Sequence, residues 1–215
     1  SSLQRVFHAW QCECASMSEP SPAAQQHRPP SIVDCVIPAH DKDFESLWHA
    51  VASLRRRCPE VRRIVVVSRE PWEGADSAGA EWCSESSDIW PFHVRDFQEC
   101  GCSAGWLFQQ LLKLYAPLVL PDLAASVLVC DADVVWLRDT RFLPCDGEGE
   151  RVNYACTFTS DTCPPIRSAV DLHRYEEFVP SVLPGLTKQR PTSETAVCHH
   201  ALLQRDIVRA LHVAV

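Results

Sequence analysis

Two mainly apolar runs, IVDCVIP (32–38) and RRIVVVS (62–68), enclose a stretch whose apolar residues recur every three or four positions. These recurring residues are Phe44, Leu47, Val51 and Leu54. A continuous β-branched run is typical of a strand buried on both faces, whereas the recurrence indicates an amphipathic helix. Three arginines and then Pro59 favour the end of that helix. The order strand, helix, strand predicts a right-handed parallel crossover.

The middle of the chain continues this alternation. Residues 69–88 are polar and contain glycines, which indicates a loop, and IWPFHV (89–94) is interpreted as a short strand. Residues 103–121 predict a strong helix with Ser103 as its N-cap. SVLVC (126–130) predicts a third buried strand.

The C-terminal third of the chain predicts one more strand and two helices. VNYACTF (152–158) indicates the strand, and residues 170–183 indicate the first helix. The last helix contains HHALLQRDIVRALH, and its cap is Thr192 or Ser193. Together these elements predict an α/β fold with a mostly parallel central sheet flanked by helices.

The chain divides into a short leading segment and one domain. Pro, Ser, Ala and Gln dominate residues 1–31, which indicates a flexible linker or stalk, and residues 32–215 form the predicted domain. The sequence begins SSLQRV without Met and stops at LHVAV, a pattern typical of a strand that is just beginning. We therefore expect truncation at both ends.

Composition narrows the classes of partner. The 215 residues carry 20 Lys and Arg against 28 Asp and Glu, so the formal net charge is -8, which argues against nucleic acid as a partner. No apolar run has the length of a membrane span. The 12 cysteines lack paired zinc spacing. They indicate either disulfides of a secretory compartment or small buried apolar residues.

The candidate chemistry begins with Asp131 and Asp133, which directly follow the predicted strand SVLVC. In an extended chain, residues two apart point to the same side, so both carboxylates can face one point. Two carboxylates held close together repel each other, and a divalent cation with oxygen ligands removes that conflict. The alternative is a pair of aspartates that cap a turn or form salt bridges.

Two further groups of residues could bind a ligand. Trp106, Gln110 and Lys113 share one face of the predicted helix, where they either contact a ligand or form a solvated side. His200 lies in a helical stripe with apolar residues, whereas His199 points about 100° away. An imidazole is a good ligand for a metal such as Mn²⁺, and the alternative is a core histidine with an exposed neighbour.

The segment from Gly105 to Leu143 resembles nucleotide-sugar-dependent glycosyltransferases of the Rossmann-like GT-A type. More narrowly, it is similar to glycosyltransferase-like proteins with W-x-x-Q-Q-x-x-K before a strand that ends in D-x-D. The matching residues are Trp106, Gln109, Gln110 and Lys113, then Asp131 and Asp133. PAHDKD (38–43), with its Lys-Asp pair, and AVCHHALL (196–203) also resemble that group.

The resemblance implies a GT-A fold with Mn²⁺ or Mg²⁺ as cofactor, a nucleotide-sugar donor and a glycan or other hydroxyl acceptor. It implies that Asp133 binds the metal, that Asp131 binds the donor or the metal, and that His199 or His200 completes the set. Lys113, Gln110 and Trp106 would contact the donor. Asp41 or Asp43 would reach its nucleoside, or else N-cap the next helix. As the catalytic base we favour Glu194, with Asp161 and Asp171 as alternatives.

The leading hypothesis from the sequence is a metal-dependent glycosyltransferase of the hexosyltransferase class. The alternatives are a catalytically degenerate GT-A-like module that binds nucleotide or glycan, and a haloacid-dehalogenase-like phosphohydrolase. In the latter, D-x-D opens the domain and continues with Gly-Thr, whereas here it lies past mid-chain and continues with Val134 and Val135. With the cysteines and the leading segment read as a lumenal stalk, the resemblance implies the Golgi lumen rather than the cytoplasm.

Overall fold

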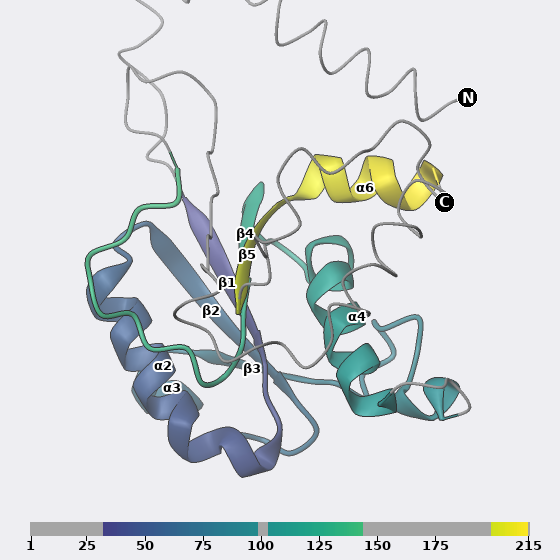
Figure 1. Ribbon diagram of the computed structural model, residues 1–215, viewed down its shortest axis with the longest axis horizontal. Helices are drawn as coiled ribbons and strands as arrows, with labels where there is room; N and C mark the ends of the chain where they lie inside the picture. The colour runs from purple at the N-terminus through teal and green to yellow at the C-terminus, as the bar shows by residue number, and fades with distance from the viewer. Residues whose placement is uncertain (1–31, 99–102, 144–198, 215) are drawn as a thin grey trace, which may run out of the picture. The chain divides into compact units, whose positions relative to one another are not determined.

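The computed structural model describes residues 32–98, 103–143 and 199–214, and these residues contain a five-stranded sheet (Figure 1). The strands lie in the order β3-β2-β1-β4-β5. Their bounds are Val33–Pro38 for β1, Val61–Ser68 for β2, Glu81–Ser84 for β3, Ser126–Cys130 for β4 and His200–Gln204 for β5. The first four strands pair in parallel, and β5 is antiparallel to β4. The predicted α/β fold with a mostly parallel sheet is confirmed.

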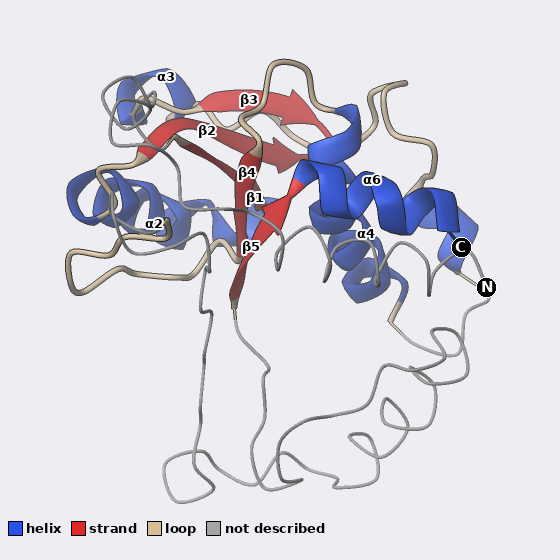
Figure 2. Ribbon diagram, turned by 90° about the horizontal axis from the view of Figure 1, so that it is seen from above, coloured by secondary structure: helices blue, strands red, loops and turns tan. Residues whose placement is uncertain are grey.

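Helices cover both faces of this sheet. The helical elements are η2 (Asp41–Asp43), α2 (Phe44–Arg57), α3 (Ala75–Ala78), η3 (Val94–Phe97), α4 (Ala104–Val119) and α6 (Arg205–Ala214). Figure 2 shows α2 and α4 on opposite sides of the strands. None of the helices within the described ranges is long and apolar enough to cross a membrane.

The hydrophobic pattern of each element explains which face it covers. Leu47, Val51 and Leu54 of α2 pack in one buried cluster with Cys35 and Ile37, alternate residues of β1. Val36, between those two, packs on the other face in a cluster with three residues of α4, namely Phe108, Leu112 and Ala116. Strand β1 is therefore buried on both sides, as its continuous apolar run requires.

The parallel order brings several chain segments to one edge. In a parallel sheet the carboxyl ends of the strands meet at the same edge, where ligands bind in open α/β folds. Strands β1 and β4 are neighbours and end at Pro38 and Cys130. Because β5 runs antiparallel to β4, its first residue His200 pairs with Cys130 at that same edge.

One predicted strand is in the wrong place. The strand β3 falls at residues 81–84, inside the segment that the sequence indicates to be a loop, and residues 89–94 form no strand. Strand β3 has four residues at the sheet edge, and Glu81 and Trp82 are exposed, so no continuous apolar run marks it. Although residues 89–94 form no strand, the Trp90 side chain is buried in the core. Its indole nitrogen donates to the Ser84 carbonyl.

The helix predicted at the C-terminal end begins later than expected. HALLQ forms strand β5, and α6 starts only at Arg205. Five residue pairs with β4 hold HALLQ extended, so tertiary pairing overrides a pattern that also fits a helix. The Arg205 side chain donates to the carbonyls of Pro117 and Leu123, which joins this corner to the end of α4. The proposed caps Thr192 and Ser193 lie outside the described residues.

Four cysteines lie in the described part of the chain, and all four are free thiols: Cys35, Cys58, Cys83 and Cys130. The sulfur atoms of Cys35 and Cys130 are 3.7 Å apart in the buried cluster beneath α2. Burial raises the pKa of the Cys58 thiol to about 12. These three buried cysteines behave as small apolar residues, the second of the two interpretations given above. The remaining cysteines lie outside the described residues.

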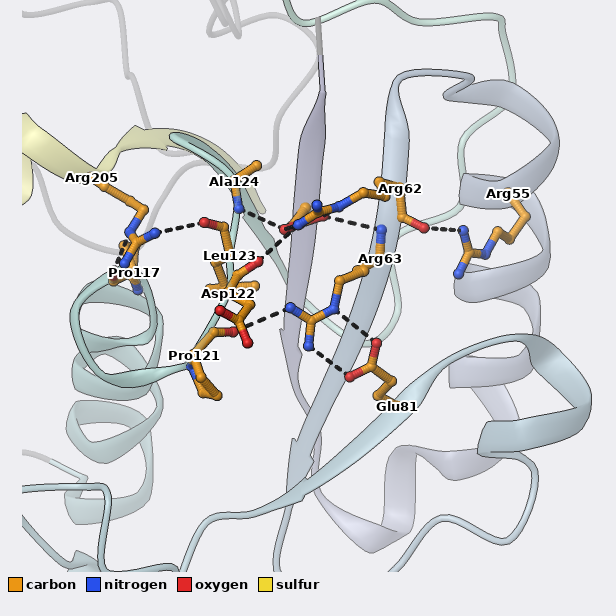
Figure 3. Close-up of polar contacts among 11 residues, drawn as sticks. Arg55, Arg62, Arg63, Glu81, Pro117, Pro121, Asp122, Leu123, Ala124 and Arg205 are labelled. Carbon is orange, nitrogen blue, oxygen red and sulfur yellow. Dashed lines mark hydrogen bonds and ion pairs between the residues drawn. The ribbon is translucent and has the colours of Figure 1, made fainter. Parts of the chain in front are cut away.

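A buried carboxylate organises the opposite, amino edge of the sheet (Figure 3). Asp34 of β1 is fully buried and accepts from Arg62 Nε at 3.0 Å and Nη2 at 2.6 Å. It also accepts from the backbone N–H of Ala124 at 2.6 Å and of Arg63 at 3.2 Å. Burial raises the pKa of Asp34, but these hydrogen bonds and the Arg62 charge outweigh it and hold the pKa below its usual value.

The same arginines fix the connection between α4 and β4. Arg62 donates to the Asp122 carbonyl at 2.9 Å, and Arg63 donates to the Pro121 carbonyl at 3.2 Å and to both carboxylate oxygens of Glu81. Asp122 itself has a positive φ of 56°, so the turn is tight. These contacts set where β4 begins, and β4 leads directly to Asp131.

Candidate metal centre

Three side chains that could hold a metal ion come together where β4 ends. Asp131 and Asp133 follow the strand, and His199 immediately precedes β5. The Asp131 N–H donates to the His199 carbonyl at 2.8 Å, which continues the pairing of the two strands into the site. One ligand atom from each of the three side chains lies within 4.8 Å of the other two. Asp131 is half-buried, and Asp133 and His199 are exposed.

The residue between the two aspartates explains why both carboxylates reach this point. Ala132 is buried and belongs to the core cluster beneath α2. The extended conformation expected for this motif is not found, because Ala132 and Asp133 are the central residues of a turn that buried Ala132 holds against the core. The Val134 N–H donates to the Asp131 carbonyl at 3.4 Å, which closes this turn around the motif and brings Asp133 back beside Asp131.

Lys113 of α4 lies against the first aspartate. Its ammonium pairs with Asp131 Oδ1, and His199 Nδ1 lies 2.9 Å from Asp131 Oδ2. Both oxygens of Asp131 therefore have a polar partner from another element. The Lys113 ammonium offsets part of the repulsion between two neighbouring carboxylates. The helical face on which the sequence places Lys113 is turned toward the D-x-D edge.

The two other residues predicted on that face of α4 are not part of this cluster. The Trp106 side chain is 50% exposed, and Gln110 Nε2 donates to Gln109 Oε1 at 3.4 Å. Both lie on the helix that carries Lys113, nearer its first residue Ala104. Ser103 occupies the N-cap position of this helix without a side-chain cap bond. A donor-binding role for Trp106 and Gln110 stays a prediction.

Asp41 and Asp43 lie just beyond the carboxyl end of β1, in η2. Asp43 occupies the N-cap position of α2, but its side chain makes no cap hydrogen bond. His40 Nδ1 accepts from the Lys42 N–H at 3.3 Å, and His40 also pairs with Asp41. Side-chain capping by either aspartate, the alternative that the sequence left open, does not occur. Contact with a nucleoside stays a prediction.

The structure separates the two adjacent histidines. The His200 ring lies 4.8 Å from the ring of Trp136 and 6.4 Å from that of Phe142, measured between centroids. Burial lowers the pKa of His200, and the neighbouring His199 adds to this effect. The expectation that His200 lies in a helical stripe is wrong, because His200 is the first residue of strand β5. Only His199 belongs to the cluster with the two aspartates.

The loop that follows Asp133 is tied to α2 and to the turn after it. The Trp136 N–H donates to Ser53 Oγ at 3.0 Å, and the Thr140 N–H donates to the Arg57 carbonyl at 2.8 Å. Further along, the Phe142 N–H donates to a carboxylate oxygen of Glu60 at 2.7 Å. These bonds hold the chain after Asp133, and the pairing of β4 with β1 holds the chain before Asp131. The two aspartates therefore lie between two restrained segments.

One carboxyl group at this edge has no counterpart among the residues predicted from the sequence. Glu85 directly follows β3, and its N–H donates to the Ser68 carbonyl at the end of β2. Burial raises the pKa of Glu85, although the charges of Arg69 and His40 act in the opposite direction. Its position was hidden because β3 itself carries no strand pattern. The predicted base Glu194, with Asp161 and Asp171, lies outside the described residues.

The donor set of the cluster fits a divalent cation. Carboxylate oxygens suit Mn²⁺ and Mg²⁺, and an imidazole nitrogen suits Mn²⁺ better than Mg²⁺. Asp131, Asp133 and His199 supply two carboxylates and one imidazole. The three residues come from both sides of one strand pair, so the fold holds them together before any ligand arrives.

Comparison with known proteins finds no matching family model and no matching curated protein. Solved structures are similar over part of the chain. The galactosyltransferase LgtC in complex with donor and acceptor sugar analogues is 20% identical over 50% of this chain, with a TM-score of 0.37. Mannosyl-3-phosphoglycerate synthase from Rubrobacter xylanophilus is 21% identical over 52% of the chain, with a TM-score of 0.32 and 37% of its own length covered.

A third similar structure is a mannosyltransferase from Pyrobaculum calidifontis in complex with GDP-Man and Mn²⁺. It is 12% identical over 64% of this chain and 37% of its own length, with a TM-score of 0.30. The chain spans about two fifths of the length of LgtC, of which 40% is covered.

Proposed function

We propose that this protein is a metal-dependent glycosyltransferase of the GT-A type. It would move a sugar from a nucleotide-diphosphate donor to a glycan or other hydroxyl acceptor. The observation that carries the proposal is the convergence of Asp131, Asp133 and His199 at the carboxyl edge of the sheet, with Lys113 beside them. A site of this composition at this edge suits an anionic ligand that is bound through a metal ion.

The chemistry of glycosyl transfer gives each of these groups a task. As the glycosyl bond breaks, negative charge develops on the leaving nucleoside diphosphate. A bound divalent ion supplies Lewis-acid stabilisation of that charge without proton transfer. Asp133 and His199 would hold such an ion, and Mn²⁺ and Mg²⁺ are the proposed cofactors. Asp131 would hold the ion or orient the donor, with the Lys113 ammonium beside it.

The remaining site residues are assigned by position. Asp41 and Asp43 follow β1 at the same edge and would reach the donor nucleoside. Trp106 and Gln110 would contact the donor from α4. For the catalytic base we propose Glu194, because it precedes the histidine pair in the sequence. We further propose a hexosyl donor and a lumenal site of action in the Golgi.

A nucleotide-sugar hydrolysis screen tests this function. Glycosyltransferases slowly transfer sugar to water, so we expect one UDP-sugar or GDP-sugar to be hydrolysed in the presence of Mn²⁺. Release of free UDP or GDP is measured over a panel of donors, with and without EDTA. Release that EDTA abolishes supports the proposal. If the protein binds a nucleotide but releases none with any donor or acceptor, it is a degenerate binding module.

A further inference from the structure

The positive charge of Lys113 lies beside the candidate ligands and would repel a metal ion that they bind. The Lys113 ammonium contacts Asp131 Oδ1 and the side chain is only 13% exposed, so the ammonium is largely shielded from solvent. The other oxygen, Asp131 Oδ2, faces His199 Nδ1 at 2.9 Å. A cation bound by Asp131, Asp133 and His199 would therefore lie next to a fixed positive charge.

The backbone of Lys113 is held firmly against the sheet. Its neighbour Leu112 is buried, and Phe108 and Ala116 on the same helix are buried in the same cluster. That cluster includes Val127 and Val129 of β4, the strand that delivers Asp131. Because α4 and β4 share one packed core, the backbone of Lys113 keeps its position relative to Asp131.

The formal charge of the group changes sign when a divalent cation binds. The two aspartates contribute two negative charges and Lys113 contributes one positive charge, so with a neutral His199 the formal charge of the group is −1. A divalent cation would leave this group with a net charge of +1. A nucleoside diphosphate carries the negative charge that completes the balance, and its phosphate oxygens are good acceptors for an ammonium.

We infer that Lys113 is a built-in counter-ion that weakens the binding of a divalent cation alone and couples that binding to the arrival of an anionic diphosphate. This role rests on the proposed function: Lys113 acts through its contact with Asp131 before the diphosphate arrives and contacts the diphosphate afterwards. When the diphosphate enters, the ammonium can turn from Asp131 Oδ1 toward a phosphate oxygen. Asp131 is then free to serve the metal.

Coulomb's law sets the size of the expected effect. Even at the dielectric constant of water, about 80, an ammonium and a divalent cation about 6 Å apart repel each other enough to weaken binding about tenfold. The shielded position of Lys113 makes the repulsion larger, since the effective dielectric constant falls inside a protein.

The test is a titration of the full 215-residue chain with Mn²⁺, in which electron paramagnetic resonance measures the free Mn²⁺. Lys113→Met removes the charge and keeps most of the side-chain length, and Lys113→Arg keeps the charge. Arg56→Met makes the same change of net charge on the exposed face of α2, at the amino edge of the sheet. Each protein is titrated alone and with UDP or GDP, and circular dichroism confirms folding.

We expect Lys113→Met to bind Mn²⁺ alone at least about tenfold more tightly than the wild type. Lys113→Arg and Arg56→Met should stay within about threefold of it. The factor by which UDP or GDP tightens Mn²⁺ binding should fall about tenfold or more in Lys113→Met. Should Lys113→Met fail to fold, Lys113→Gln replaces it with the same expectations.

Mn²⁺ binding to Lys113→Met that is equal to or weaker than that of the wild type overturns the counter-ion role. So does equal tightening in Arg56→Met, because the effect would then come from net charge. If neither UDP nor GDP tightens Mn²⁺ binding in any variant, the proposed function fails. The Mn²⁺-only arm decides separately whether Lys113 controls the cation.

Discussion

Replacing Arg62 with methionine is expected to destabilise the fold by about 2–3 kcal/mol at neutral pH, less than for a fully buried ion pair because the Arg62 side chain is 46% exposed. The substitution leaves Asp34, which is fully buried, without its ion-pair partner while its carboxylate still lies in the core. Only the two backbone N–H groups of Ala124 and Arg63 remain to stabilise that charge. Because a domain is stable by only about 5–15 kcal/mol, urea denaturation should show the loss as a much lower midpoint.

The neighbouring arginine provides the control. Arg63→Met breaks an equally well-formed pair with Glu81, but the Glu81 side chain is 54% exposed, so the expected loss is about 1 kcal/mol or less. Equal losses in the two variants would contradict the assignment of Asp34 as the buried centre of this network.

Acid pH should reduce the difference between wild type and Arg62→Met. The folded-state pKa of Asp34 lies below its usual value of 3.8, so its contribution is present above that pH. It is lost as pH falls through the folded-state pKa. In the variant, burial without Arg62 raises the pKa, so the carboxyl group takes up a proton at a higher pH. A difference in unfolding free energy that stays constant from pH 7 to pH 3 would argue against this.

Asp133→Ala is expected to lower kcat/KM for nucleotide-sugar hydrolysis by at least about a hundredfold, because Lewis-acid stabilisation contributes several kcal/mol. The side chain is exposed, so the unfolding temperature without ligands should barely change. Steady-state rates at saturating Mn²⁺ measure the effect. They are compared with Asp139→Ala, which removes an exposed carboxylate from the same loop.

Asp139 pairs with Arg57 and lies away from the three candidate ligands, so its variant should keep activity within about threefold. Activity of Asp133→Ala close to that of Asp139→Ala would remove Asp133 from the metal site. Nucleotide-sugar hydrolysis that resists both substitutions and EDTA would point to a reaction without a metal ion.

The sequence predicts the central crossover well because each of its elements has one dominant signal. The strands β1, β2 and β4 are mainly apolar runs rich in valine, and α2 and α4 have helical periodicity. Strand β3 has no such signal, because its exposed residues Glu81 and Trp82 give it the polar, non-periodic pattern of a loop. Strand β5 also lacks one, because HALLQ fits a helix as well as a strand and only its pairing with β4 decides.

In the candidate site, too, some residues have a local sequence signal and others are brought in only by the fold. Asp131 and Asp133 are singled out by their local spacing, and helical periodicity places Lys113 on one face with Trp106 and Gln110 without showing what that face meets. His199 lies beside the two aspartates because it immediately precedes strand β5, whereas the sequence predicts a helix there and leaves the choice between His199 and His200 open. The contact between Lys113 and Asp131 joins two elements, so the sequence alone could not show it. The position of Glu85 at the carboxyl edge of the sheet could be predicted only after β3, the strand that it follows, had been recognised.

Thermal unfolding with UDP or GDP in the presence and absence of Mn²⁺ tests the proposed metal-dependent donor site most directly. At about a hundredfold excess over Kd, binding stabilises by about 2.7 kcal/mol, which raises Tm by about 5 °C or more in a chain of this size. We predict that this shift requires Mn²⁺ and nucleotide together and vanishes in Asp133→Ala. No shift with either nucleotide and Mn²⁺, or the same shift in Asp133→Ala, would contradict it.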